Sequence, residues 1–383
     1  MKITFPHMGD LWIVVKALFE ALDIEVVVPP PNSKKTLNIG TRLAPESACL
    51  PLKLNLGNFI EAKETGADTI IMTGGIGPCR FGLYGELERE ILKEAGYDFD
   101  AVILEPPDGS IPGLLKRIRY LVGDEHSWVR ILGAIRFAYT KSVTMDRIED
   151  IIHGARPRLG VEAEVLYRSA KDKLVQATSY AGLEQVVRGL RTEVKGRQLA
   201  RIEQQSGLEV GEPLKVGIVG EIYTILDPYS SVDVEEQLGQ LGAHVDRSIY
   251  LSAWVAKHVF LGVTNGYKSL KPYHKLAKPY LNHFVGGHGQ ETVGAVVKYA
   301  RSGFDGIIHL FPLTCMPEIV ASSILPRVQQ DYKIPVMTLI VDEHTGHAGV
   351  QTRLEAFVDL LERSRHQRSI LSDGERDTSM AAR

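Results

Sequence analysis

Three cysteines, Cys49, Cys79 and Cys315, are the residues of this 383-residue sequence that most clearly could do chemistry. Each has a proline within two residues, which stiffens the local backbone and fixes the direction of the thiol. Cys79 follows an apolar segment that ends at Met72, and Cys315 follows one that ends near Phe311. A small, odd number of cysteines is no disulfide framework, so we expect free thiols.

Free cysteines often serve as small buried hydrophobic residues. Such structural cysteines favour the interiors of strands and helices, whereas these three lie in loops marked by glycine and proline. In open α/β sheets, ligands bind where strands end. We therefore favour a thiolate metal site gathered from distant parts of the chain. A helix that begins after each cysteine is expected to lower the thiol pKa and to favour the thiolate that binds metals.

Three thiolates suit either zinc or an iron–sulfur cluster, and the spacing does not choose between them because the chain has no CxxC pair. Zinc needs a fourth ligand, which His344 or His347 could supply. Asp342 and Glu343 share that segment, although a polar turn before the last helix needs no metal. A [4Fe-4S] cluster with three cysteine ligands leaves one iron open to water or substrate, as a Lewis acid or redox centre.

The elements that would position these thiols alternate between strands and helices. The strands are continuous apolar segments, such as residues 69–72, 216–219 and 306–311, and apolar residues recur at helical spacing between them. Continuous apolar strands are covered on both faces of a sheet. The sequence therefore predicts an α/β fold with two Rossmann-like domains, each a doubly wound parallel sheet.

A charged stretch with few turn signals separates the two alternating parts, and we expect it to be helical. The last residues are polar and unpatterned, which is typical of a mobile tail. Cys49 and Cys79 fall in the first α/β domain and Cys315 in the second. The expected ranges are 1–125 for the N-terminal domain, 126–210 for the helical connector, 211–363 for the C-terminal domain and 364–383 for the tail.

Composition and charge narrow the class of protein. With 44% hydrophobic and 24% charged residues, the chain is ordinary for a globular protein and long enough to bury two cores. A net charge of −3 gives no global positive field for nucleic acid. No apolar segment approaches the roughly 18 residues that span a bilayer. The sequence opens without a secretory leader, so we expect a cytoplasmic protein.

Several motifs around these residues resemble those of acyl-CoA dehydratase activase-related proteins, often labelled CoA protein activase. These proteins are relatives of 2-hydroxyacyl-CoA (2-hydroxyglutaryl-CoA) dehydratase subunits and of double-cubane cluster proteins. The resemblance extends from Met1 to about Glu362. The motifs lie at residues 5–9, 50–53, 74–82, 219–223, 286–291, 311–318 and 341–346.

The resemblance implies two Rossmann-like domains around an oxygen-sensitive [4Fe-4S] cluster with Cys49, Cys79 and Cys315 as its ligands. In the dehydratases the cluster takes one electron from an ATP-dependent activase and passes it to a 2-hydroxyacyl-CoA thioester, giving a ketyl radical that loses water. The implied partners are thus an activase, an acyl-CoA substrate and a second subunit, in a homodimer or a heterodimer. Three alternatives stay open: a reductase that uses the cluster on a related substrate, a non-catalytic electron carrier or activase partner with the same cluster, and a zinc hydrolase with cysteine and histidine ligands.

This sequence departs from the group in two ways. It has no GxxxxGK[ST] motif and no glycine-rich phosphate loops of the sugar-kinase type, so the activase label does not imply ATPase activity. It also has too few cysteines for a double-cubane protein. One chain should hold a single cubane unless two chains share a larger cluster.

The residues around Cys79 offer further candidates for contacts with a cofactor. Gly74, Gly75 and Gly77 follow a strand and could cradle a phosphate, but they lack the GxGxxG spacing. Glycines that let the Cys79 loop approach a cluster are the better explanation. Arg80 is a candidate to balance the charge of a cluster.

The second domain offers candidates at the same kind of position. Glu221 and Tyr223 follow the strand at residues 216–219 and could contact substrate or support the site. His288 lies in a glycine-rich segment at the start of a helix. The segment could bind an anion, but a structural turn explains it equally well. Glu318 follows Cys315 at a helix start, where a carboxylate complements the helix dipole.

Overall fold

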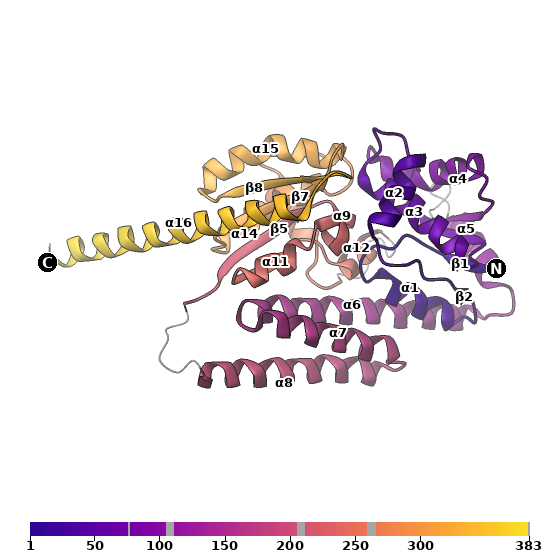
Figure 1. The fold of residues 1–383 in the computed structure, drawn as a ribbon, viewed down its shortest axis with the longest axis horizontal. Helices are drawn as coiled ribbons and strands as arrows, with labels where there is room; N and C mark the ends of the chain where they lie inside the picture. The colour runs from indigo at the N-terminus through magenta and orange to yellow at the C-terminus, as the bar shows by residue number, and fades with distance from the viewer. Residues whose placement is uncertain (76, 105–110, 205–210, 259–265, 382–383) are drawn as a thin grey trace.

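The fold is built on two parallel β-sheets with the same strand order (Figure 1). The computed structural model describes residues 1–75, 77–104, 111–204, 211–258 and 266–381. The strand order is β2-β1-β3-β4 in the first sheet and β6-β5-β7-β8 in the second, and all neighbouring strands are parallel. The strands are β1 (Lys2–Thr4), β2 (Glu25–Val26), β3 (Thr69–Thr73), β4 (Asp100–Leu104), β5 (Leu214–Gly220), β6 (Ala243–Arg247), β7 (Gly306–Pro312) and β8 (Val336–Val341).

These sheets confirm the predicted α/β class with two Rossmann-like domains. In each sheet the first strand lies between the second and the third, so the chain winds in opposite directions from the two central strands. The crevice at the carboxyl ends of those central strands is where ligands of doubly wound folds bind. In this protein those strands are β1 and β3 in one sheet and β5 and β7 in the other.

In the first domain, helices α2 and α4 pack with a long buried helix, α3, on one face of the sheet, and α1 and α5 lie on the other face. Thirteen of the fifteen residues of α3 are buried, because the helix packs on its own sheet and also reaches the second domain. Leu50 and Leu54 of α3 belong to the hydrophobic core of the second domain, which makes the contact between the domains apolar at its centre. The helices are α1 (Leu11–Glu20), α2 (Lys34–Leu43), α3 (Leu50–Glu64), the 3₁₀ helix η1 (Arg80–Leu83), α4 (Tyr84–Glu94) and α5 (Ile111–Val122).

Three long helices connect the two sheets: α6 (Trp128–Leu159), α7 (Val161–Gln176) and α8 (Tyr180–Gln204). They share a hydrophobic core of their own, into which Ile13 of α1 also packs. Helix α6 lies beneath both domains (Figure 1). The buried Arg247 of β6 forms an ion pair with Glu149 of α6, which fastens this layer to the second sheet.

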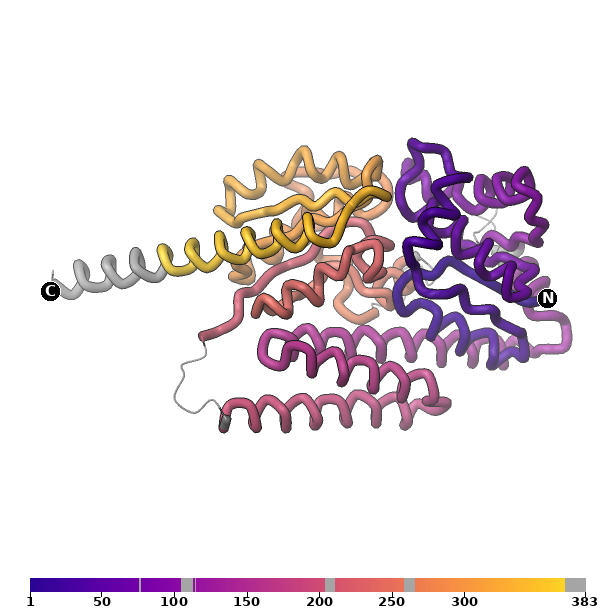
Figure 2. The backbone as a smooth tube through the Cα atoms, in the orientation of Figure 1, coloured from indigo at the N-terminus to yellow at the C-terminus, as the bar shows by residue number. Residues whose placement is uncertain are grey.

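The second domain follows the long helices in the chain. Figure 2 shows the path of the chain from the first domain through these helices to the second domain. Across the described ranges, no helix combines the length and the apolar character needed to cross a membrane. The helices of this domain are α9 (Ile222–Leu226), α10 (Pro228–Ser231), α11 (Val234–Gln240), α12 (Leu251–His258), α13 (Lys271–Ala277), α14 (Gly289–Arg301), α15 (Met316–Tyr332) and α16 (His347–Ala381).

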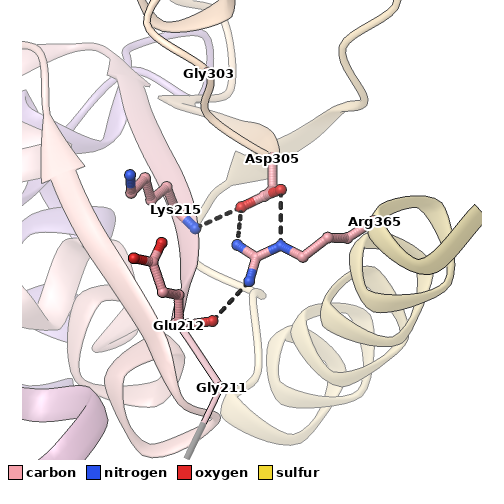
Figure 3. A pocket seen from close by; sticks show the side chains of 6 residues that line it. All are labelled: Gly211, Glu212, Lys215, Gly303, Asp305 and Arg365. Atoms are coloured by element: carbon pink, nitrogen blue, oxygen red, sulfur yellow. Dashed lines mark hydrogen bonds and ion pairs between the residues drawn. The ribbon is translucent and has the colours of Figure 1, made fainter. Parts of the chain in front are cut away.

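The residues from 364 onward, which we expected to form a mobile tail, continue helix α16 as far as Ala381. Contacts between residues distant in the sequence anchor the beginning of this extension. Arg365 forms an ion pair with the mostly buried Asp305 and donates to the carbonyl oxygens of Glu212 and Pro213 (Figure 3). These groups border an open pocket of about 500 Å³ at the amino ends of β5 and β7. The carboxylate of Asp305 and the guanidinium of Arg365, which line this pocket, bind each other. We therefore assign the pocket to the anchoring of α16.

Candidate functional site

The three cysteines occupy equivalent positions, each immediately before a helix. Cys49 precedes α3, Cys79 precedes η1 and then α4, and Cys315 precedes α15. Cys79 and Cys315 also follow the central strands β3 and β7, as predicted from the sequence. We call the loops that carry these residues the cysteine edge.

Arg80 joins the three loops of the cysteine edge. Its guanidinium donates to the carbonyl oxygen of Ser47 (2.9 Å) and to that of Thr314 (2.6 Å). The Thr314 hydroxyl in turn donates to the carbonyl oxygen of Ser47 (3.1 Å). Ser47 lies two residues before Cys49, and Thr314 lies directly before Cys315. Arg80, which directly follows Cys79, therefore holds the loops of both other cysteines across the boundary between the domains.

Backbone strain accompanies these contacts at Thr314. Its φ of 68° is in the left-handed region, which β-branched residues strongly avoid. The bonds of its carbonyl and hydroxyl groups to Arg80 and Ser47 hold it there. Strain of this kind is concentrated at ligand sites and active sites.

Burial dominates the protonation of the thiols. It raises the pKa of Cys49 to about 12, and it also raises the pKa of Cys79 and of Cys315. The expected lowering of the thiol pKa by helix N-termini is therefore wrong for the net effect. The N–H groups at the helix starts do act in the expected direction, because those of Phe81 and Glu318 lower the pKa of Cys79 and Cys315. Their effect is smaller than that of burial. Buried thiols of this kind give up their protons to a metal cation more readily than to water.

The positive charge of Arg80 opposes the effect of burial on two of the thiols. The guanidinium lowers the pKa of Cys49 and of Cys79 against the larger effect of burial. An uncompensated group of thiolates would repel itself in this partly buried site. Arg80 thus combines a structural role with partial neutralisation of negative charge.

Two carboxylates from the second domain face the cysteine edge. Glu221 raises the pKa of all three thiols, and Glu318 raises that of Cys79 and Cys315. Glu221 is held by the backbone N–H groups of Tyr223 (3.0 Å) and Thr224 (2.9 Å) at the start of α9. Its position at the carboxyl end of β5 agrees with the sequence interpretation.

Glu318 has a partner that the sequence interpretation missed. Its Oε2 lies 2.9 Å from Nε2 of His309 in β7, and both side chains are fully buried. The carboxylate thus binds an imidazole in addition to lying in the first turn of α15. A histidine inside an apolar strand was the available signal, because buried polar groups need partners.

A glycine-rich turn from the second domain covers the Cys79 loop. A β-carbon at Gly287, whose φ is 46°, would lie 3.8 Å from the Cys79 sulfur, and one at Gly286 would lie 2.7 Å from the Cys79 nitrogen. A β-carbon at Gly289 would lie 2.4 Å from the carbonyl oxygen of Pro317. The buried His288 therefore sits in a turn between the Cys79 loop and the start of α15, directly before α14.

The glycines before Cys79 allow close backbone packing. Gly74 directly follows β3. Gly75 touches Gly82 of η1, where a β-carbon would lie 2.3 Å from the Gly75 oxygen. Gly77 has a φ of 132° and lies against the ring of Phe284. With these contacts the glycines let the Cys79 loop pack closely against η1.

Tyr223 does not face the thiols but belongs to a hydrogen-bond network between the domains. Its hydroxyl donates to the carbonyl oxygen of His7 (2.9 Å) and accepts from Asn32 (3.1 Å). Asn32 also donates to Asp227 (2.9 Å) and accepts from Asn58 (2.9 Å). All five residues are buried. We call His7, Asn32, Asn58, Tyr223 and Asp227 the buried network.

Two residues of the segment that carries His344 and His347, the candidate zinc ligands, have other contacts. Glu343 forms an ion pair of 2.6 Å with Lys53 of α3, and Asp342 accepts a hydrogen bond from the backbone N–H of His344 (3.0 Å). Within the described ranges, no three His, Cys, Asp or Glu side chains lie close enough together to hold one metal ion.

Comparison with known protein families gives one match. Residues 7–73 match the family model described as the CoA enzyme activase uncharacterised domain (DUF2229). The match supports an activase-related family. It includes Cys49, α3 and the His7, Asn32 and Asn58 contributions to the buried network, and it ends within β3, before Cys79. No curated protein matches the chain.

Proposed function

We propose that this protein binds a [4Fe-4S] cluster at the cysteine edge through Cys49, Cys79 and Cys315. In this proposal it receives low-potential electrons from an ATP-dependent activase and acts on an acyl-CoA, as a relative of 2-hydroxyacyl-CoA dehydratase subunits. The observation that carries the proposal is the set of bonds from Arg80 to the loops of the other two cysteines. These bonds hold together, across the boundary between the domains, the loops that carry the other two cysteines.

The donor set suits an anionic iron–sulfur group. Three thiols are the expected ligands of a cubane with one open iron, and each lies at the start of a helix whose N–H groups favour negative charge. When bound, a cluster would supply one-electron transfer and Lewis acidity at that iron. The chain itself would contribute the positive charge of Arg80, a rigid backbone at Thr314, and the carboxylates Glu221 and Glu318 beside the thiols.

The same site suggests the setting in which the protein works. Free thiols and an oxygen-sensitive cluster need a reducing compartment, which is consistent with the cytoplasm. The match to an activase-type domain supports a partner protein or a CoA substrate. We propose a second subunit, in a homodimer or a heterodimer, because related dehydratase subunits work in pairs.

Anaerobic reconstitution with iron and sulfide tests the cluster directly. We expect about four irons and four acid-labile sulfides per chain for the wild type. Cys79→Ala and Cys315→Ala should lose most of both, whereas the control Ser323→Ala, on the exposed face of α15, should retain them. Stoichiometric zinc without iron in the protein as isolated, or full iron content in Cys79→Ala, would contradict the assignment.

A second experiment separates an enzyme from an electron carrier. The reconstituted protein, an ATP-dependent activase and a reductant are mixed with 2-hydroxyglutaryl-CoA, and loss of water from the thioester is followed by mass spectrometry. Product that depends on the protein supports the lyase. Reduction of the cluster by the activase without product supports the carrier.

A further inference from the structure

Each cysteine sulfur at the cysteine edge has a donor group that favours its thiolate. For Cys79 and Cys315 the donors are the backbone N–H groups of Phe81 and Glu318. For Cys49 the donor is a side chain, the hydroxyl of Tyr84, whose oxygen lies 2.7 Å from the sulfur. Cys49 is thus the cysteine whose sulfur environment a single substitution can change without altering the backbone.

The position of Tyr84 is fixed by packing. It is the first residue of α4 and only 3% exposed, in a hydrophobic cluster that includes Leu52, Phe59 and Met72. Its ring also contacts that of Phe81, with 5.9 Å between the ring centres. A thiolate can only accept a hydrogen bond, so the Tyr84 hydroxyl is the donor when Cys49 is a thiolate.

We propose that Tyr84 is a positioning residue that donates a hydrogen bond to the Cys49 thiolate and raises the reduction potential of the bound cluster. The inference rests on the proposed function. A donor to a ligand sulfur withdraws negative charge from the cluster, and the reduced state carries one more electron than the oxidised state. The hydrogen bond therefore stabilises the reduced state more, and it makes electron transfer from the activase to the cluster more favourable.

The test compares Tyr84→Phe with the wild type after anaerobic reconstitution, in a redox titration followed by electron paramagnetic resonance. Loss of the hydroxyl should shift the one-electron equilibrium about tenfold towards the oxidised form, a potential about 59 mV more negative. Tyr97→Phe is the matched control, because Tyr97 packs on the same hydrophobic cluster and belongs to the same domain. Its potential should equal that of the wild type.

A second variant keeps the inference testable if Tyr84→Phe assembles a cluster poorly. Incorporation of 3-fluorotyrosine at position 84 keeps the ring and makes the hydroxyl a stronger donor, so the potential should rise. Opposite shifts in the two variants support the role of Tyr84. Equal potentials in wild type and variants, with equal iron contents, would overturn this role and leave the cluster assignment intact. Failure of the wild type itself to take up iron and sulfide would overturn both.

Discussion

The two domains meet at two polar regions that are built differently. The buried network joins uncharged amide, hydroxyl and carbonyl groups to one carboxylate, Asp227, and all its members are shielded from water. The cysteine edge is only partly buried and depends on the charged, half-buried Arg80 and a strained Thr314. Hydrogen bonds shielded from water are costly to break, whereas half-exposed ones exchange with water at little cost. The buried network therefore fixes how the two domains pack on each other, and the cysteine edge adjusts the positions of the thiols.

Helix α3 connects these two regions. Cys49 lies directly before its first residue, and Asn58, two turns further on, belongs to the buried network. Between them, Asn55 donates to the buried Glu88 of α4 (2.9 Å). A change in the buried network therefore acts on a ligand-bearing helix, whereas a change at Arg80 acts on loops.

The largest effect is expected from breaking the buried network at its centre. Asn32→Ala removes the bonds to His7, Tyr223, Asp227 and Asn58 and leaves several polar groups buried without this partner. Such a change should reduce the free energy of unfolding by about 3 kcal/mol, measured by urea titration. Asn38→Ala, at an exposed position of α2, is the control and should change it by less than about 0.5 kcal/mol. A small effect of Asn32→Ala would mean that apolar contacts alone fix the domains.

A second effect, on the pH dependence of stability, is expected from Glu88 of α4, the partner of Asn55 in α3. Burial raises the pKa of Glu88 from 4.5 to about 8. Between these values the folded state holds a proton that the unfolded state releases, so this group's contribution to stability is present at low pH and is lost as pH rises to 8. Relative to Glu88→Gln, the wild type should lose about 2 kcal/mol of unfolding free energy between pH 5.5 and 7.5. Parallel stability curves for the two proteins would show that Glu88 has no such shift.

The sequence predicts the strands of the sheet centres well, because β5 and β7 are continuous apolar segments buried on both faces. It misses β6, where His244 and Asp246 alternate with buried residues in an edge strand. It also misses the helical end of α16, since the ion pair of Arg365 with Asp305 joins residues 60 apart in the chain.

For the site, local motifs suffice to single out the cysteines, because glycine and proline mark the strand ends. They do not identify the partners. Tyr223 follows a strand just as Glu221 does, yet its hydroxyl bonds to residues about 200 positions away. The bond from Arg80 to Thr314 spans 234 positions. Contacts at such separations depend on how the domains pack, and no local pattern reports them.

The smallest effect on stability, and the most specific one, is expected at Arg80. Arg80→Ala removes bonds that are half-exposed, so global stability should change by no more than about 1 kcal/mol. The loops of Cys49 and Cys315 should nevertheless separate more often, and iodoacetamide should modify these thiols roughly fivefold faster in the metal-free protein. Mass spectrometry of the labelled peptides measures each cysteine separately.

Arg80→Lys decides whether charge or geometry matters at this position. A lysine keeps the positive charge but lacks the planar fork that bonds Ser47 and Thr314 at once. If Arg80 acts chiefly by joining the loops, Arg80→Lys should label as fast as Arg80→Ala. Labelling at the wild-type rate would instead mean that charge alone holds the cysteine edge together. The buried network should be unaffected in both variants, so a change of no more than about 1 kcal/mol in the free energy of unfolding is the internal control that separates the two regions.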